Sequence, residues 1–581
     1  MVTPETFEQI DEKTHYAYAW KYVSEPTDEK EEKAASDDFS KALMTQSIVS
    51  ENDLEDYLPR YANPAVSFAE DDMGSDKSMG GVLLYILVVI IGFIFAVTIT
   101  NTISKESSAI GTLRASGYTK GELVRHYIAM PVAVTLFAAC VGNVLGYTVC
   151  KNVVVSMYYN SYSLPGYTTL WNTDAFIKTT VVPVVLMFAV NLGVISKMMN
   201  HTPLEFLRGN LKKSKRQKTM RLPNVKFFSR FRMRIILQNA ANYLILFAGV
   251  FFVMILLAMS LGLPSTLEYY QDNAENMMFS KYQYVLSSYE DDDGDLIQTE
   301  NPDAEKVSIS SLIRKSDALD EEISVYSVAE GSRYIKIDGL ENLKNNEVFI
   351  SQTFSQKYSL NKGDVFELEE KYENKSYEFK VAGIYDKSIS LAVFMPEESY
   401  KAMFELKENE FGGFLSDTEI TDIDEDYIAT VITKADITKM CDQLNHSMGS
   451  YMDYFSVLCV ALSAVLIYML STLIIEKNES AISMAKILGY TNGEIGSLYL
   501  NSTTIVLIIS NAVGAVAGVY VMKEIWKQML LTYNGWFEFR MEPDGYVKMF
   551  FFVLIGYLVV MLINYRRIKR VPMAQALKDA E

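Results

Sequence analysis

The chain has 581 residues, of which 49% are hydrophobic, and its formal net charge is −19. These figures fit neither a soluble enzyme nor a helical bundle that is wholly buried in lipid. They indicate a membrane protein with sizeable acidic parts outside the bilayer. The four cysteines show no CxxC spacing, which argues against a metal or redox centre.

Residues 1–79 are polar and acidic. Between Glu5 and Lys77 they contain 19 aspartates or glutamates against 7 lysines or arginines. No apolar run follows Met1, so the sequence shows no signal peptide here. The composition of residues 25–38 favours local disorder, whereas the aromatic residues further on favour the edge of a folded domain. We expect this acidic region to be part of a domain outside the membrane.

Seven apolar stretches follow that are long enough to cross a membrane, for which about 20 residues are needed. They lie near Val82–Thr100, Ile128–Val149, Thr179–Ser196, Leu244–Leu263, Phe455–Ile475, Leu500–Met522 and Val547–Asn564. Residues 197–234 contain twelve lysines and arginines and a single acid, Glu205. The positive-inside rule therefore assigns them to the cytoplasm, so residues 1–79 and 264–450 fall outside. Contact with anionic lipid headgroups fits this basic segment, and no nucleic acid is needed to explain it.

A short stretch occurs twice in the membrane region. Residues 105–122 read KESSAIGTLRASGYTKGE and residues 477–494 read KNESAISMAKILGYTNGE, at a constant offset of 372. We call them the first knob and the second knob. An offset held over that distance indicates an internal repeat. The contact candidates in the two knobs are Ser108, Ala109, Ile110, Gly117, Tyr118, Thr119 and Glu122, and Ser480, Ala481, Ile482, Gly489, Tyr490, Thr491 and Glu494.

Each knob predicts a bent helical element between two spans. We expect a helix to leave the membrane at Lys105 or Lys477 and to end at the glycine of the GYT sequence, because glycine suits the left-handed residue after a helix end. Thr119 and Thr491 each precede a glutamate by three residues, which is the capping-box spacing at a helix start. One copy would fit a plain solvated elbow. Two copies in fixed register favour a dedicated docking element.

The offset of 372 continues beyond the knobs. It carries Gly142 and Gly146 onto Gly514 and Gly518, and small residues four apart on an apolar helix permit close helix contact. We therefore predict a helix-packing role for these four glycines. No charged residue or histidine lies deep within a predicted span, which argues against a proton- or ion-coupled carrier.

The largest soluble region lies between the fourth and fifth spans. Runs typical of β-strands occur at Tyr282–Leu286, Ser324–Val328, Tyr334–Ile337, Glu347–Ile350, Val365–Glu369, Tyr377–Ile384, Ala392–Met395 and Tyr427–Thr433. Helices are expected at Ser351–Tyr358, Glu397–Phe404 and Ala435–His446. This pattern predicts an inserted α/β domain. We expect its last helix to continue into the fifth span as a rigid stalk.

The fold class is accordingly a polytopic α-helical membrane protein of about seven spans, with two repeated three-span units and an inserted α/β extracytoplasmic domain. The expected boundaries are 1–79 for the acidic outer region, 80–208 for the first unit, 209–241 for a basic linker, 242–264 for the fourth span, 265–450 for the outer domain and 451–581 for the second unit. No GxSxG, HExxH or GxxxxGK[ST] motif is present. We therefore expect no catalysis, no bound metal and no ATP hydrolysis by this chain.

These features together resemble the FtsX-like permease domain that is shared by the MacB and lipoprotein-release type of ABC transporters. The resemblance rests on S-A-I…G-Y-T-x-G-E in each knob, on the GxxxG span, and on the tails T-P-L-x-x-L-R and V-P-M-x-x-A-L-K. It covers roughly residues 80–580. Within the outer region, residues 348–383 resemble the core of the family's extracytoplasmic domain.

The resemblance implies a permease subunit of a bacterial plasma membrane that works with a separate cytoplasmic ABC ATPase. Two knobs imply two ATPase copies, which would bind the ATP and magnesium and contact the knobs. The spans would transmit ATPase motion to the outer domain, for export or release of a peptide, lipoprotein or other amphiphile. The alternative is a non-transporting regulator that switches an outer partner such as a cell-wall hydrolase or a sensor kinase. An intramembrane enzyme is the third interpretation, and it lacks a catalytic constellation.

One feature departs from the family's pattern. A complete half has four spans, with the outer domain between its first and second spans. The second half complies, but the first half has three. We expect the native reading frame to begin upstream of Met1 with a further span; the alternative is a genuine seven-span form.

Overall fold

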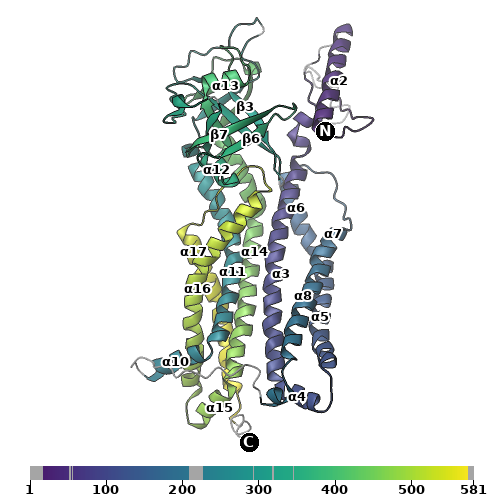
Figure 1. Ribbon diagram of the computed structural model, residues 1–581, viewed down its shortest axis with the longest axis vertical. Coiled ribbons are helices and arrows are strands. Elements are labelled where there is room, and N and C mark those ends of the chain that lie inside the picture. Colours follow the sequence, from purple (N-terminus) through teal and green to yellow (C-terminus); the bar gives the residue numbers. More distant parts are fainter. Residues whose placement is uncertain are drawn as a thin grey trace, which may run out of the picture.

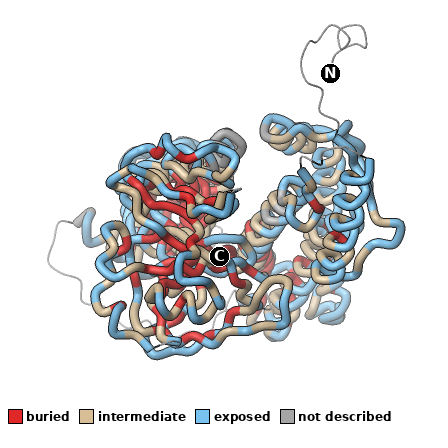
Figure 2. The backbone as a smooth tube through the Cα atoms, turned by 90° about the horizontal axis from the view of Figure 1, so that it is seen from above, coloured by how far each residue is buried: buried red, intermediate tan, exposed pale blue. Residues whose placement is uncertain are grey.

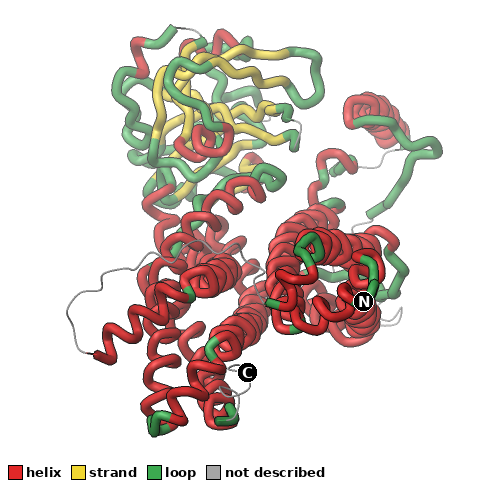
Figure 3. The backbone as a smooth tube through the Cα atoms, turned by 60° about the horizontal axis from the view of Figure 1, so that its bottom comes forward, coloured by secondary structure: helices red, strands yellow, loops and turns green. Residues whose placement is uncertain are grey.

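The computed structural model describes residues 17–50, 54, 56–208, 227–291, 293–316, 319–344 and 346–573. The molecule is elongated, and all of the described strands gather at one end, which we call the domain end (Figures 1 and 3). The knob helices α4 (Ser107–Ala115) and α15 (Glu479–Ile487) lie at the opposite end, which we call the knob end (Figure 1).

Seven helices among the described residues are long and apolar enough to cross a membrane, as predicted. The first span of the first unit is α3 (Phe68–Lys105). The second is α5 (Lys120–Leu145), which continues through a π-helical turn (Gly146–Cys150) into α6 (Lys151–Ser161). The third consists of α7 (Thr173–Phe176), a second π-helical turn (Ile177–Val181) and α8 (Val182–Met198). The others are α11 (Ala240–Asn273), α14 (Lys434–Lys477), α16 (Asn492–Leu530) and α17 (Pro543–Arg570). Two shorter helices, α9 (Pro203–Leu207) and α10 (Phe227–Gln238), complete the knob end.

Helix α11 is the centre of the second half of the membrane region. Within its most apolar window 61% of the residues are buried, against 11–28% for the three spans of the first unit. Figure 2 shows the same contrast, because buried residues concentrate in one of the two bodies seen from above. The two bodies touch through Phe93 of α3 and Phe252 of α11, whose rings are 5.8 Å apart. The second half is therefore the more closely packed part of the bundle.

The region between α11 and α14 is a β-rich domain with two sheets. One sheet has four strands in the order β10-β1-β9-β2, and the other is a closed barrel in the order β3-β4-β8-β5-β7-β6. The strands are β1 (Tyr282–Leu286), β2 (Glu305–Val307), β3 (Ile309–Arg314), β4 (Glu321–Val328), β5 (Glu347–Ser351), β6 (Val365–Glu369), β7 (Ser376–Tyr385), β8 (Ala392–Pro396), β9 (Gly413–Ser416) and β10 (Ile428–Thr433). The two predicted short helices are present as α12 (Gln352–Tyr358) and α13 (Glu397–Met403).

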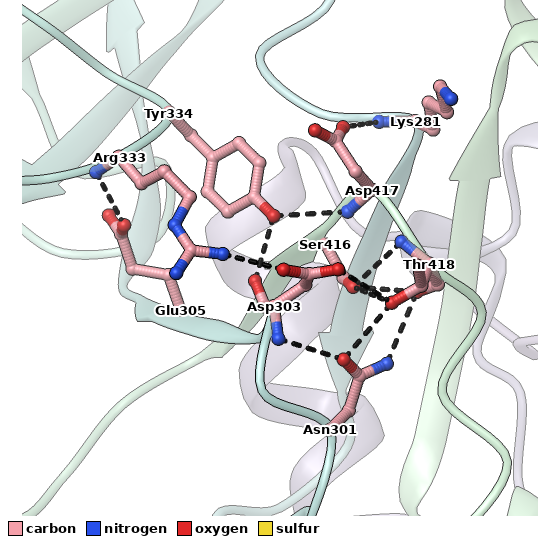
Figure 4. Close-up of polar contacts among 9 residues, drawn as sticks. All are labelled: Lys281, Asn301, Asp303, Glu305, Arg333, Tyr334, Ser416, Asp417 and Thr418. Atoms are coloured by element: carbon pink, nitrogen blue, oxygen red, sulfur yellow. Dashed lines mark hydrogen bonds and ion pairs between the residues drawn. The ribbon is translucent and has the colours of Figure 1, made fainter.

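One predicted strand, Tyr334–Ile337, is wrong, because this segment forms a loop. The Tyr334 hydroxyl donates to the Asp303 carbonyl at 2.7 Å and accepts the Asp417 backbone N–H at 3.1 Å. Beside it, the Arg333 guanidinium pairs with the Asp303 carboxylate at 2.7 Å (Figure 4). The apolar residues of the segment pack in the domain core. The polar and apolar side chains alternate here because they hold a loop against the domain, and the segment pairs with no strand among the described residues.

The disorder expected for residues 25–38 is also wrong, because this stretch enters helix α2 (Glu29–Val49). The Asp28 side chain caps the helix by accepting the Glu31 backbone N–H at 2.8 Å. Trp20 packs against Phe39, with ring centroids 4.6 Å apart, and this contact holds one face of the helix. Three aromatic residues outside the charged stretch therefore order it, and composition alone did not reveal them.

Helix α14 confirms the predicted stalk. It runs without a break for 44 residues from the end of β10 to the second knob. At about 1.5 Å of rise per residue, this helix spans roughly 66 Å. A single element therefore reaches from the β-rich domain to the knob end.

A second connection joins the β-rich domain to the loop between α16 and α17. Lys357 of α12 and Glu321 of β4 form an ion pair at 2.6 Å, and their side chains are 1% and 3% exposed. Lys357 also donates to the carbonyls of Tyr533 and Gly535, and Glu321 accepts the Gly535 N–H. Burial lowers the pKa of Lys357, and the Glu321 carboxylate opposes that shift. We call this arrangement the domain latch.

We predict that Lys357→Met will lower the unfolding temperature of the β-rich domain and release the α16–α17 loop. Removing one partner of a buried ion pair leaves the other charge uncompensated, at a cost of roughly 3–5 kcal/mol. The double variant Lys357→Met, Glu321→Gln should recover part of that loss, because the lone carboxylate is gone. Thermal unfolding and hydrogen exchange of residues 531–542 measure both effects. Equal stability of Lys357→Met and the wild type would contradict the prediction.

Candidate functional site

The two knobs have the same backbone structure. Each knob helix ends at a glycine in the left-handed region, with φ +103° at Gly117 and +89° at Gly489. The Tyr118 N–H donates to the Leu113 carbonyl and the Tyr490 N–H to the Ala485 carbonyl, both at 3.1 Å. This six-residue bond over a left-handed glycine is the Schellman ending of a helix. The predicted glycine termination is confirmed in both copies.

The predicted capping boxes are confirmed as well. In each knob the threonine hydroxyl accepts the backbone N–H of the glutamate three residues later, and the glutamate carboxylate accepts the threonine N–H. The second bond is 2.8 Å long at Thr119–Glu122 and at Thr491–Glu494. The turn between the knob helix and the next span is therefore fixed from both sides.

One expectation about the knobs needs correction. The helix that leaves the membrane does not continue to the glycine, because it ends at Lys105 or Lys477 and a separate helix begins after a break at Glu106 or Asn478. The break turns the knob helix so that Ile110 packs against the end of the third span. Each knob is thus a distinct short helix set at an angle to its span.

The candidate contact residues separate into two groups. Ile110 and Ile482 are fully buried in separate apolar clusters, so their contact assignment is corrected: they anchor the knobs. Ser480 and Tyr490 are partly buried. The exposed candidates are Ser108, Ala109, Gly117, Tyr118, Thr119, Glu122, Ala481, Gly489, Thr491 and Glu494. These exposed residues form the surface that a partner at the knob end would meet.

The second knob also exposes apolar residues that sequence reasoning missed. Met484, Ile487 and Leu488 lie on its surface, and Leu488 is 69% exposed. The offset of 372 places Thr112, Ala115 and Ser116 at the matching positions of the first knob. The two knobs therefore share a backbone but differ in surface chemistry. Comparing the two copies position by position would have revealed this difference.

Sequence reasoning also missed a basic residue in each knob. Lys486 is buried and donates to the carbonyls of Ile568, Lys569 and Val571 at 2.8, 3.2 and 2.7 Å, at the end of α17. Burial lowers the pKa of this lysine. The last carbonyls of a helix have no partner within the helix, so a side chain from another helix satisfies them here.

The first knob has the same contact at the same offset. Arg114, which is 372 positions before Lys486, donates to the carbonyls of Met199 and His201 just after α8. Met199 in turn stands 372 positions before Val571. The signal in the sequence was a basic residue at one position of both repeats, with a different side chain in each copy.

The four candidate packing glycines differ between the units. Gly514 and Gly518 face α11, where an added Cβ would lie 3.4 and 2.9 Å from atoms of Met254. At Gly142 and Gly146, no atom of the described residues lies within 4 Å of such a Cβ. Close packing is therefore seen for the second pair, and for the first pair the packing role remains a prediction.

Comparison with known protein families gives a match in two places. The model described as FtsX-like permease C-terminal matches residues 81–203 and 454–573. Each match contains one knob with the spans before and after it. No curated protein matches the chain.

We predict that Gly489→Ala will loosen the second knob, because a residue with a Cβ costs about 1–2 kcal/mol in the left-handed conformation. Amide exchange of residues 484–492 should accelerate, whereas exchange in the β-rich domain should not change. The matched control is Gly493→Ala, since Gly493 has no positive φ and its added Cβ meets only Thr491 Oγ1, at 4.0 Å. Equal exchange rates in the two variants would contradict the prediction.

Proposed function

Because the chain carries two FtsX-like permease domains, we propose that it is the membrane subunit of an ABC-type system in which a separate ATPase moves the two knobs. The observation that carries this proposal is the repeated knob itself. Two elements of equal backbone structure lie at one end of the bundle, and a 44-residue helix connects one of them to the β-rich domain. A force applied at the knob end has a direct route to the domain end.

In the proposed orientation the knob end lies in the cytoplasm of a bacterium and the β-rich domain lies outside the plasma membrane. The basic residues support this, because Arg230, Arg232 and Arg234 of α10 belong to the knob end, as does the basic end of α17 (Figure 1). Lysine and arginine are enriched on the cytoplasmic side of membrane proteins. The remaining part of the basic linker, 209–226, lies outside the described residues.

Two knobs imply two ATPase subunits, which bind ATP and magnesium. The exposed surfaces of the knobs differ, since the second knob has Met484, Ile487 and Leu488 where the first knob has the smaller Thr112, Ala115 and Ser116. The two ATPase subunits, or two sites on one ATPase dimer, therefore meet unequal surfaces. We propose that the second knob provides the stronger contact, because apolar burial contributes about 25 cal/mol per Å².

The proposed mechanism is transmission of movement, with no wide passage through the bundle. At the centre of the second half, α11, α14 and α17 pack around Val250 and Leu470 with no space for a water-sized sphere. Between α3 and α14 there is a cavity of about 280 Å³. Such packing favours work on a peptide, lipoprotein or other amphiphile at the outer side. It also fits the alternative, a regulator that switches an outer protein partner.

We predict opposite accessibility of the two ends in intact cells. In a variant whose four native cysteines are replaced by alanine, Gln298→Cys in the β-rich domain should react with a membrane-impermeant maleimide. Leu488→Cys in the second knob should react only after the membrane is opened. Both positions are exposed, so protein burial does not confound the comparison. Labelling of Leu488→Cys alone in intact cells would overturn the proposed orientation.

We predict that much less ATPase will bind to the double variant Gly117→Val, Gly489→Val than to the wild type. A β-branched side chain cannot readily adopt the positive φ of either glycine, so both docking surfaces are distorted. Co-purification followed by mass spectrometry and Mg-ATP hydrolysis measures the loss, which should be at least about tenfold. The control is Gly121→Ala, Gly493→Ala in the same turns. If the valine variant co-purifies with as much ATPase as the wild type, the knobs only connect the spans and do not dock a partner.

A further inference from the structure

The second knob is joined to its neighbours in two different ways. It meets α14 through the break at Asn478 and α16 through the turn at Gly489, and both are chain interruptions. Residues at element ends are where backbone angles change most readily in hinge motions. The buried Ile482 packs in one apolar cluster with residues of α14, α16 and α17. With α17 the knob also makes side-chain hydrogen bonds, to the end of that helix.

That contact is made from one face of the knob helix. Lys486 donates to three carbonyls of α17 and the residues after it, and the Ser483 hydroxyl bonds the carbonyls of Pro572 and Met573 at 2.8 and 2.7 Å. Positions three apart lie on the same face of a helix. The burial of Lys486 excludes competing water, so the knob helix and the end of α17 are held as one body.

The other end of α17 is joined to the β-rich domain. Residues 531–542 form the loop that leads into it. In the domain latch, Lys357 donates to the Gly535 carbonyl of this loop and Glu321 accepts the Gly535 N–H. The Arg540 backbone N–H and carbonyl also bond the Thr266 hydroxyl of α11, at 3.0 and 2.9 Å. The loop is thus fixed to both the domain and the bundle.

We propose that α17 is the arm that delivers displacement of the second knob to the β-rich domain, and that Lys486 is the positioning residue that fastens the knob to this arm. The inference rests on the proposed function, since it assumes a force at the knob. It adds a route beside the continuous helix α14, whose junction with the knob is a break. The equivalent contact of Arg114 in the first knob indicates that arginine can serve in the same place.

The repeat supplies the matched variants. Lys486→Met keeps the length of the side chain but removes its three donors, and Lys486→Arg restores donors of the kind seen at Arg114. In the full chain in lipid nanodiscs without ATPase, amide exchange of residues 479–490 and 566–573 should be about tenfold faster in Lys486→Met. Lys486→Arg should match the wild type. Equal protection in all three proteins would overturn the fastening role.

A second measurement tests transmission with the captured ATPase bound. Spin labels at Gln298→Cys and Tyr167→Cys report the distance between the β-rich domain and the domain end of the first unit. A non-hydrolysable ATP analogue should change the distance between the labels in the wild type. The fraction of molecules that show this change should be about tenfold smaller in Lys486→Met and unchanged in Lys486→Arg, with ATPase binding equal in both variants. A full shift in Lys486→Met would overturn the proposal. If the wild type binds no ATPase, the proposed function fails, and the exchange experiment still decides the fastening role.

Discussion

Within a bilayer, every backbone N–H and C=O must find a partner inside the protein. The seven long helices among the described residues satisfy this requirement along their length, so the chain leaves helical geometry chiefly at the two ends of the bundle. There the unpaired backbone groups become attachment points. Carbonyls at the end of α17 bind Lys486, those after α8 bind Arg114, and the loop before α17 binds Lys357. The same rule that enforces continuous helices thus determines where they are fastened.

Features set by local chemistry were predictable from the sequence. The spans follow from apolar length, and the capping boxes and left-handed glycines of the knobs follow from residue type and spacing. Most strands of the β-rich domain followed from β-branched and aromatic runs, as at Val365–Glu369. For the spans and the knobs the stabilising partner lies within a few residues or is the lipid itself, so a short window of sequence contains the information. The predicted strands have distant partners, such as β10 for β1, and were recognised from their residue types alone.

Features set by distant partners were not predictable in this way. Strand β3 (ISSLIR) is rich in serine and β9 is only four residues long, and both exist because neighbouring strands supply their hydrogen bonds. The burial of Ile110 requires knowledge of the break at Glu106, and the order of α2 requires Trp20. The internal repeat offered a partial remedy. A basic residue at position 114 and again at position 486 would have identified the fastening residues.

The two units finally differ in what surrounds them more than in their local sequence. The glycines of α16 are covered by α11, whose Met254 and Phe251 approach the helix backbone there. Gly142 of α5 and Gly146 of the π-helical turn that follows it stand at the equivalent positions, but no described atom lies within 4 Å of a Cβ added to either. A close helix contact in a membrane depends on both partners, because glycine supplies only the room and the facing helix supplies the dispersion contacts. The second half, with α11 at its centre and a latched loop at its domain end, is therefore the more closely packed of the two, and the spans of the first unit are less buried.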